Sequence, residues 1–230
     1  MFVLEGLSVT YPDGTKALDN VTFSLAEGES AVLAGANGAG KSTLILASVG
    51  VLPSAGTVRS AGILLEKKNL AELRRKTGVL FQNPDDQLFS ATIYDDVAFA
   101  PRSAGLSAKE TDARVNAALA LLGIEYLKDR TPLKLSGGEK RLAALASVIA
   151  MEPSVLLFDE PTAFLDPRAR RELIKILNGL PQTKLIATHD LAFAEAVSTR
   201  AIVLKNGAVF ADGAAHDILQ NEKLLEESGL

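Results

Sequence analysis

Gly35-Ala36-Asn37-Gly38-Ala39-Gly40-Lys41-Ser42 is the most informative segment of this chain. It fits the pattern G-x-x-x-x-G-K-S, and it lies between a predicted strand, Ser30 to Gly35, and a predicted helix that runs from Gly40 through Val49. Its glycines let backbone N–H groups turn inward around an anion, and the helix N-terminus adds positive partial charge. The segment therefore predicts a loop that binds the phosphates of a nucleotide.

Individual residues of this loop have distinct expected roles. We expect Lys41 to reach the β- and γ-phosphates and the hydroxyl of Ser42 to bind Mg²⁺. The alternative is a glycine-rich turn with an incidental lysine, which the flanking strand and helix disfavour. The residues of this segment that we expect to contact the nucleotide are Gly35, Asn37, Gly38, Gly40, Lys41, Ser42 and Thr43.

Two adjacent carboxylates follow another short hydrophobic strand. Val155 to Phe158 leads into Asp159 and Glu160, at the strand end where ligands of open α/β sheets bind. We expect Asp159 to bind Mg²⁺ through its water shell and Glu160 to activate the attacking water as a general base. An isolated Asp-Glu pair would commonly be a solvated loop. Together with the phosphate loop, the pair indicates hydrolysis of a nucleoside triphosphate.

A third motif lies shortly before the acidic strand end. Leu135-Ser136-Gly137-Gly138-Glu139 opens a predicted apolar helix, Gly138 to Met151, and so offers a second ring of N–H donors at a helix N-terminus. On its own, such a segment would more simply cap a helix. One chain has one triphosphate to bind, so a second phosphate cradle makes sense if it completes the site of a neighbouring copy.

Short hydrophobic runs alternate with helical patterns along much of the chain. Phe2 to Thr10 and Val21 to Leu25 predict antiparallel strands joined through Pro12-Asp13-Gly14, and Asn83 to Gln87 is a polar loop. The further predicted strands are Thr77 to Gln82, Val155 to Phe158, Lys184 to Thr188 and Ala201 to Leu204. The further predicted helices are Ile93 to Ala100, Ala108 to Leu122, Gly138 to Met151, Pro167 to Leu180 and Asp190 to Val197.

This order predicts an α/β fold. Continuous apolar strands with crossover helices imply a mainly parallel sheet covered on both faces, preceded by an N-terminal antiparallel β region. We expect one domain over residues 1–230, in which 1–82 and 152–230 form the nucleotide-binding core and 83–151 form an inserted α-helical subdomain.

The composition excludes several classes of protein. The chain has 230 residues, 47% of them hydrophobic, so it can bury a substantial core, and the absence of cysteine excludes disulfides and thiolate metal sites. A net charge of −4 gives no basic footprint for nucleic acid, so we expect no nucleic-acid partner. No run of eighteen apolar residues and no secretory signal is visible, so we expect a chain that does not span the membrane.

The three motifs, in this order and spacing, resemble those of the ABC ATPases, which have a RecA-like P-loop NTPase core, over essentially the whole chain. The resemblance implies that Gln82 senses Mg²⁺ and faces a membrane partner, that Asp166 links two sites, that His189 contacts the γ-phosphate and that Tyr11 stacks on adenine. Plainer alternatives are a solvated glutamine, a surface histidine and a tyrosine that ends its strand.

Within that family, Phe81 to Phe89 and Asp95 to Phe99 resemble the ATPases of cobalt/nickel and energy-coupling-factor vitamin importers. The resemblance implies that this stretch docks the transmembrane subunit, although an ordinary solvated loop is the alternative. Relatives commonly have proline, arginine and glycine where this chain has Ala36, Leu142 and Phe164.

The implied function is ATP hydrolysis that powers an importer, with ATP and Mg²⁺ as cofactors. Two ATPase subunits, either identical or paired homologues, would associate head to tail at the cytoplasmic face of the membrane, with a transmembrane subunit beside them and a substrate-capture membrane subunit acting indirectly. The alternative is a soluble ABC-family ATPase of DNA repair or assembly. Such proteins usually have coiled coils, zinc cysteines or tandem ATPase units, none of which occurs here.

Overall fold

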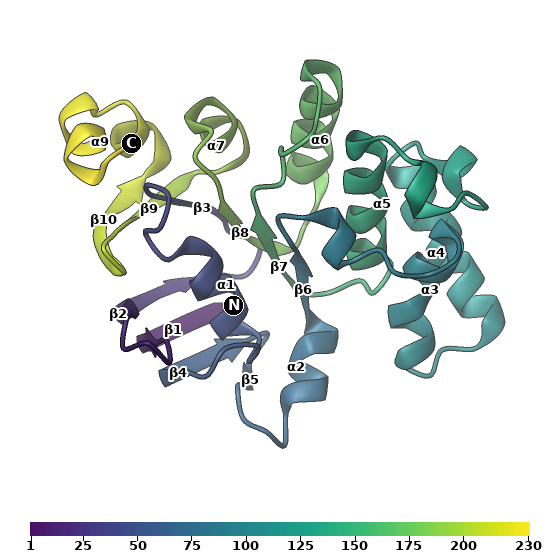
Figure 1. The fold of residues 1–230 in the computed structure, drawn as a ribbon, viewed down its shortest axis with the longest axis horizontal. Helices are drawn as coiled ribbons and strands as arrows, with labels where there is room; N and C mark the ends of the chain where they lie inside the picture. The colour runs from purple at the N-terminus through teal and green to yellow at the C-terminus, as the bar shows by residue number, and fades with distance from the viewer.

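The computed structural model describes residues 1–230, which form two sheets and the helices that cover them (Figure 1). The strands are β1 (Phe2–Thr10), β2 (Lys16–Leu25), β3 (Ser30–Ala34), β4 (Ala55–Ser60), β5 (Ile63–Leu64), β6 (Thr77–Leu80), β7 (Val155–Asp159), β8 (Thr183–Ala187), β9 (Arg200–Lys205) and β10 (Ala208–Ala214). The helices are α1 (Lys41–Ser48), α2 (Leu70–Lys76), α3 (Ile93–Ser103), α4 (Ala108–Leu121), α5 (Gly137–Ile149), α6 (Pro167–Gly179), α7 (Leu191–Val197), α8 (Ala215–Leu219) and α9 (Glu222–Ser228).

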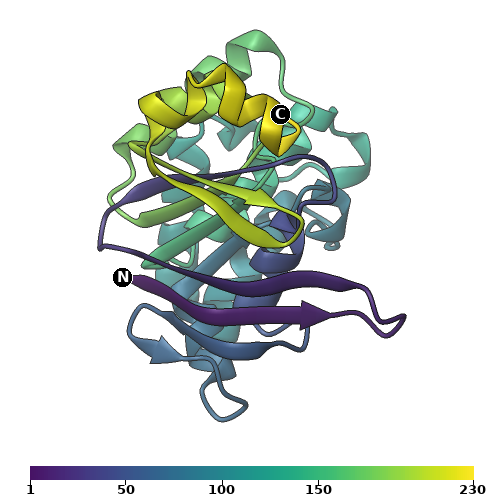
Figure 2. The ribbon, with the colours of Figure 1, turned by 90° about the vertical axis from the view of Figure 1, so that its left-hand side faces the viewer.

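The larger sheet has the strand order β10-β9-β3-β8-β7-β6. Its strands β9, β3, β8, β7 and β6 are parallel, and β10 joins the edge as the antiparallel partner of β9. The smaller sheet is antiparallel, with the order β2-β1-β4-β5. Figure 2 shows this smaller sheet as a layer below β10, with the C-terminal helices at the opposite side. The predicted fold class is therefore confirmed.

The two faces of the larger sheet bury separate cores, which explains why its strands are continuously apolar. In β7, Leu156 and Phe158 join the core beneath α3 to α7, whereas Val155 and Leu157 join the core between the two sheets and α1. All five residues of β7 and all five of β8 are buried. Burial on both faces is typical of parallel sheets, and the common direction of the strands places their carboxyl ends at one edge.

Helices α3, α4 and α5 pack together at one end of the molecule, and α8 and α9 lie at the other (Figure 1). A short 3₁₀ helix, Pro84–Asp86, joins the larger sheet to this helical end, and its first turn is capped by the Asn83 side chain, which accepts from the amide of Asp85. None of the helices is both long and apolar enough to cross a membrane.

Several predicted boundaries were wrong. Strand β2 begins at Lys16 rather than Val21, because its backbone pairs with β1 along a stretch whose exposed side chains give no hydrophobic signal. The loop predicted over Asn83 to Gln87 contains the 3₁₀ helix Pro84–Asp86. Helix α3 continues through Pro101 to Ser103, since Pro101 is buried against the helical core, where packing compensates for its missing N–H.

Other elements were not predicted at all. Strands β4, β5 and β10 and helices α2, α8 and α9 are short or expose much of their surface. The hairpin of β9 and β10 turns at Asn206 and Gly207, both with positive φ (50° and 78°), and this Asn-Gly pair is a standard hairpin signal. It could have revealed β10 from the sequence.

Candidate nucleotide site

The loop before α1 forms one wall of a cavity of about 570 Å³ at the carboxyl ends of the parallel strands. The cavity is lined by Tyr11, Thr15, Lys16, Ala17, Asn37, Gly38, Gly40, Lys41, Ser42, Thr43, Gln82, Asp159, Glu160, Asn206 and Gly207. Two thirds of these residues were predicted, and the others come from the end of the loop that follows β1, the start of β2 and the turn before β10. The cavity thus joins residues that are far apart in the sequence.

Two glycines of the loop are required by the space around them. Gly40 has φ 105°, and a Cβ there would lie 2.7 Å from the carbonyl oxygen of Ala17. Gly35, outside the cavity, has φ 150°, and a Cβ there would lie 2.5 Å from the carbonyl oxygen of Leu204. Contacts this short do not occur for real side chains, so the loop conformation depends on both glycines.

Lys41 is buried in the loop. Its Nζ donates to the carbonyl oxygens of Gly35, at 2.6 Å, and Ala36, at 3.1 Å. Burial lowers the pKa of Lys41, while the nearby carboxylates Glu160 and Asp159 act in the opposite direction. The ammonium group is thus held inside the loop, where phosphate oxygens could replace the carbonyls as its acceptors.

Asp159 is the last residue of β7, and it lines the cavity. Its Oδ1 atom is buried and has no hydrogen-bond partner. Burial is the main cause that raises the pKa of Asp159, Ser42 acts in the opposite direction, and the neighbouring Glu160 raises it further. A buried carboxylate oxygen without a partner requires an explanation, and a bound cation would satisfy it.

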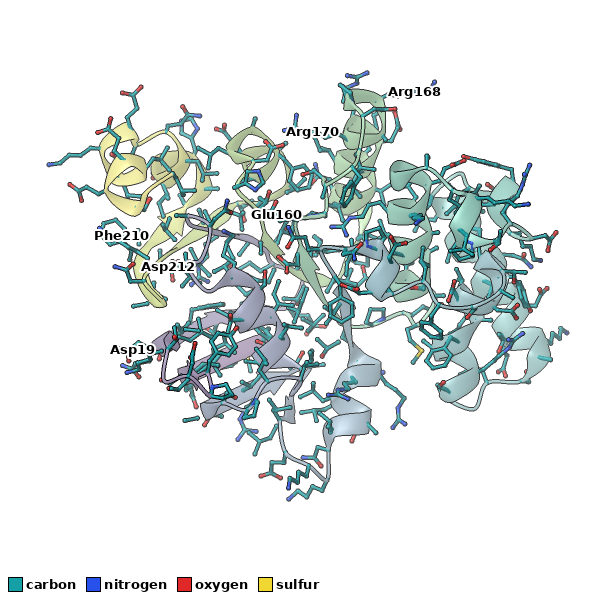
Figure 3. All side chains as sticks on the ribbon, viewed as in Figure 1. Asp19, Glu160, Arg168, Arg170, Phe210 and Asp212 are labelled. Carbon is teal, nitrogen blue, oxygen red and sulfur yellow. The ribbon has the colours of Figure 1, made fainter.

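Glu160 follows Asp159 and is labelled in Figure 3. It is 8% exposed, and its φ of 47° lies in the left-handed region that favours glycine. Its Oε1 accepts from the backbone N–H of His189 at 3.2 Å and lies 2.8 Å from Nδ1 of the same residue. Its Oε2 accepts from the hydroxyl of Thr188 at 3.1 Å. The carboxylate of Glu160 is therefore held beside His189 by these hydrogen bonds, and the backbone of Glu160 is strained.

Arg141 lies beneath these carboxylates, and sequence reasoning assigned it no role. It comes from the second turn of α5 and is 1% exposed. Its guanidinium donates to the backbone carbonyls of Phe81, Gln82, Asp159, Glu160 and Pro161. It thus connects α5 to the two strand ends that carry Gln82 and the acidic pair. No sequence pattern reports such carbonyl partners.

Tyr11 and Gln82 both line the cavity. The hydroxyl of Tyr11 is 2.8 Å from that of Thr43, and its ring is partly exposed. Gln82 is exposed and lines the cavity next to Ser42 and Asp159. The positions of both residues are compatible with their expected roles, which remain predictions.

The Leu135–Glu139 segment does not line the cavity of its own chain. Ser136 caps α5 in a capping box: its Oγ accepts from the amide of Glu139, whose Oε2 in turn accepts from the amide of Ser136 at 2.9 Å. The amides of Gly137 and Gly138 donate to no acceptor in the chain. The simple capping role is therefore present, and two N–H donors outside the cavity remain available.

Asp166 also has a capping role. Its Oδ1 accepts from the amides of Arg168 and Ala169, both at 2.8 Å, and so begins α6. It does not line the cavity, and its expected role between two sites remains a prediction.

A second cavity, of about 190 Å³, lies between β6 and the helices α3 and α5. Phe89 and Phe99 form part of its wall, 67% and 53% exposed, with their rings in an edge-to-face pair 5.1 Å apart. Oδ2 of Asp96, which is buried in the same wall, has no partner. Gln87, also in this wall, donates to the carbonyl of Ala144 in α5 at 2.9 Å. We call this cavity the Phe89–Phe99 groove.

Comparison with known proteins agrees with this site. A family model described as ABC transporter matches residues 18–163. An energy-coupling factor transporter ATP-binding protein, EcfA of Carboxydothermus hydrogenoformans, is 46% identical, and the match covers 99% of this chain and 85% of that protein. The cobalt import ATP-binding protein CbiO of Rhodobacter capsulatus is 44% identical, with 98% and 83% covered.

A solved structure extends the comparison. The ATP-binding cassette MJ0796, in a dimeric post-hydrolysis state bound to ADP and Pi, superposes with a TM-score of 0.86 and 28% identity, covering 94% of this chain and 99% of that one. The family model spans more than half of the chain and includes both the phosphate loop and the acidic strand end. The chain belongs to the ABC transporter family, as an ATP-binding and ATP-hydrolysing subunit.

Proposed function

We propose that this ATPase powers the uptake of a metal ion, cobalt or nickel, or of a vitamin, as a peripheral subunit at the cytoplasmic face of a membrane. The proteins named for energy-coupling-factor transport and cobalt import support this class of substrate, since both match nearly the whole chain. The chain's partners are a second ATPase subunit and a transmembrane subunit, with a substrate-capture membrane subunit acting indirectly.

One observation carries the mechanism: the free amides of Gly137 and Gly138 do not line the phosphate-binding cavity of their own chain. Each chain has two helix N-termini that could bind phosphate, but only one triphosphate. Both N-termini contact ATP if two chains pair head to tail, so that each ATP lies between Lys41 of one subunit and Ser136-Gly137 of the other. ATP then stabilises the closed pair, because the γ-phosphate contacts both subunits.

The residues present fit a magnesium ion at the cavity floor. Oδ1 of Asp159 is buried without a partner, and Ser42 and Gln82 line the same cavity. This set of oxygen donors is what Mg²⁺ prefers when phosphate oxygens and water complete its shell. When bound, Mg²⁺ neutralises charge on the phosphates. Ser42, Asp159 and Gln82 are the residues that would hold it.

The groups around the γ-phosphate position have separate roles in this proposal. Glu160 accepts a proton from the attacking water, and its carboxylate is oriented for this by Thr188 and His189. The imidazole of His189 is mostly exposed, so it can reach the γ-phosphate as well as Glu160. Tyr11 stacks on adenine, and Asp166 faces the second subunit.

The Phe89–Phe99 groove is the proposed docking site for the transmembrane subunit. Its aromatic wall and the unpartnered Oδ2 atom of Asp96 suit a helix with one apolar face and a basic side chain. Residues 83–151 act as the inserted helical subdomain. The nucleotide cavity is connected to this subdomain through Arg141 of α5, which donates to the carbonyl of Gln82 at 3.2 Å.

The substitution Glu160→Gln tests the proposal. The variant should bind ATP and accumulate a stable dimer, while turnover falls about a hundredfold or more, because the general base is lost but the shape of the site is kept. Dimer formation is measured by sedimentation and turnover by phosphate release. Glu172→Gln, on an exposed turn of α6, is the matched control and should leave both unchanged. Full turnover in Glu160→Gln would contradict the assignment.

A further inference from the structure

Arg170 lies in the first turn of α6, and Figure 3 labels it between α6 and α7. Its Nη2 atom donates to Oδ1 of Asp190, the residue before α7, at 2.7 Å. The two side chains are 33% and 30% exposed, so the ion pair is partly shielded from water. Neither residue lines the nucleotide cavity. The contact joins the start of α6 to the segment that follows β8.

Asp190 is the only acceptor of the Arg170 guanidinium. The Nε atom of Arg170 is buried without a partner, and only Nη2 makes a hydrogen bond. Oδ1 of Asp190 also accepts from the amide of Phe193 at 2.9 Å and so begins α7. The Asp190 carboxylate is therefore held between the two helices. Because Arg170 has this one partner, loss of its side chain should act through Asp190.

Asp190 is bonded in turn to the threonine that contacts Glu160. The amide of Asp190 donates to Oγ1 of Thr188 at 3.1 Å. The same hydroxyl donates to Oε2 of Glu160 at 3.1 Å. A hydroxyl has one hydrogen, and its oxygen can accept another donor at the same time. The amide of Asp190 thus supports an orientation in which the threonine hydrogen is directed to the carboxylate.

The residue between these two contacts the other oxygen of Glu160. The amide of His189 donates to Oε1 at 3.2 Å, and its Nδ1 lies 2.8 Å from the same atom. Residues 188–190 therefore surround the carboxylate of Glu160, and Arg170 anchors this segment to α6. A displacement of about 1 Å in a reacting group can cost a hundredfold in rate, so the anchor matters for chemistry as well as for folding.

We propose that Arg170 is a positioning residue for ATP hydrolysis. By holding Asp190 it fixes residues 188–190, and through them the carboxylate of Glu160 and the imidazole of His189. The inference rests on the proposed role of Glu160 as the general base, and it adds a residue that contacts neither the nucleotide nor the metal. The structural alternative is an ion pair that only joins α6 to α7, which would affect stability without a specific effect on the hydrolysis step.

Substitution of Arg170 tests its effect on the rate. Arg170→Met should lower kcat about tenfold at unchanged KM for ATP, because the nucleotide-binding residues are intact while Glu160 loses its support. Arg170→Lys should recover kcat to within about twofold, since one donor is enough for the single bond to Asp190. Arg171→Met replaces the exposed arginine that follows in α6 and is the matched control, with unchanged kcat. Phosphate release over a series of ATP concentrations gives kcat and KM.

A double-mutant cycle separates positioning from a general loss of stability. In the full-length Glu160→Gln chain, Arg170→Met should lower single-turnover phosphate release by less than about twofold, because the group through which Arg170 acts is already absent. A tenfold loss in both backgrounds would overturn the inference, and so would wild-type kcat in Arg170→Met. If Glu160→Gln itself keeps full turnover, the proposed general base fails instead.

Discussion

Arg141 is a buried charge whose partners are all backbone carbonyls. The acceptors lie 18 to 20 residues away, at and after the end of β7, and 59 to 60 residues away, after β6, so one guanidinium joins three segments. Burial lowers its pKa to about 10, and Asp159 and Glu160 act in the opposite direction, so the group stays charged at neutral pH. A planar cation with five N–H donors can satisfy this set of carbonyls in a way that lysine cannot.

Two substitutions of Arg141 should affect the stability of the fold and the rate of ATP hydrolysis to different extents. Arg141→Met leaves buried carbonyls without donors and should lower the free energy of unfolding by about 3 kcal/mol. Arg141→Lys restores the charge with fewer donors, so it should recover most of the stability but keep a reduced kcat at unchanged KM for ATP, because Glu160 is no longer held in place. Urea denaturation and steady-state turnover measure the two effects. Full kcat in Arg141→Lys would contradict a positioning role.

At the scale of elements, two helices begin with the same capping box but lie in different surroundings. In α4, Oγ of Ser107 accepts from the amide of Glu110, whose Oε2 accepts from the amide of Ser107 at 2.9 Å. In α5, Ser136 and Glu139 repeat this geometry. Only α5 begins with glycines whose amides have no acceptor in the chain. The same substitution in the two caps can therefore be compared for its effect on stability and for its effect on ATP turnover.

Ser107→Ala and Ser136→Ala should each lower the free energy of unfolding by about 1 kcal/mol, because each removes one cap hydrogen bond. Only Ser136→Ala should also lower ATP turnover, since its hydroxyl is proposed to reach the phosphate held by the second subunit. Denaturation and phosphate release measure the pair under the same conditions. Equal turnover in the two variants would mean that Ser136 serves α5 alone.

Across the whole molecule, the sequence predicted elements whose burial follows a pattern. Strands β3, β7 and β8 are buried on both faces and appear as apolar runs, and the phosphate loop was found by its G-x-x-x-x-G-K-S pattern, in which Gly35 and Gly40 are required sterically. Strand β10 has no fully buried residue and gave no such signal. Arg141 and Thr188 could not be assigned roles, because their partners are brought close only by folding.

The composite site makes a prediction that belongs to the dimer as a whole. Lys41→Ala removes the phosphate-binding lysine, and Ser136→Arg blocks the opposite cradle, so each variant alone should hydrolyse little ATP. In a mixed head-to-tail dimer, however, the intact loop of one chain meets the intact cradle of the other, and one of the two sites is complete. Random pairing makes half of the dimers mixed, so an equimolar mixture should recover about a quarter of the wild-type rate if the sites act independently. Phosphate release measures the rate, and native mass spectrometry verifies that mixed dimers form. Mixed dimers without any recovered activity would show that the loop and the cradle do not serve the same ATP.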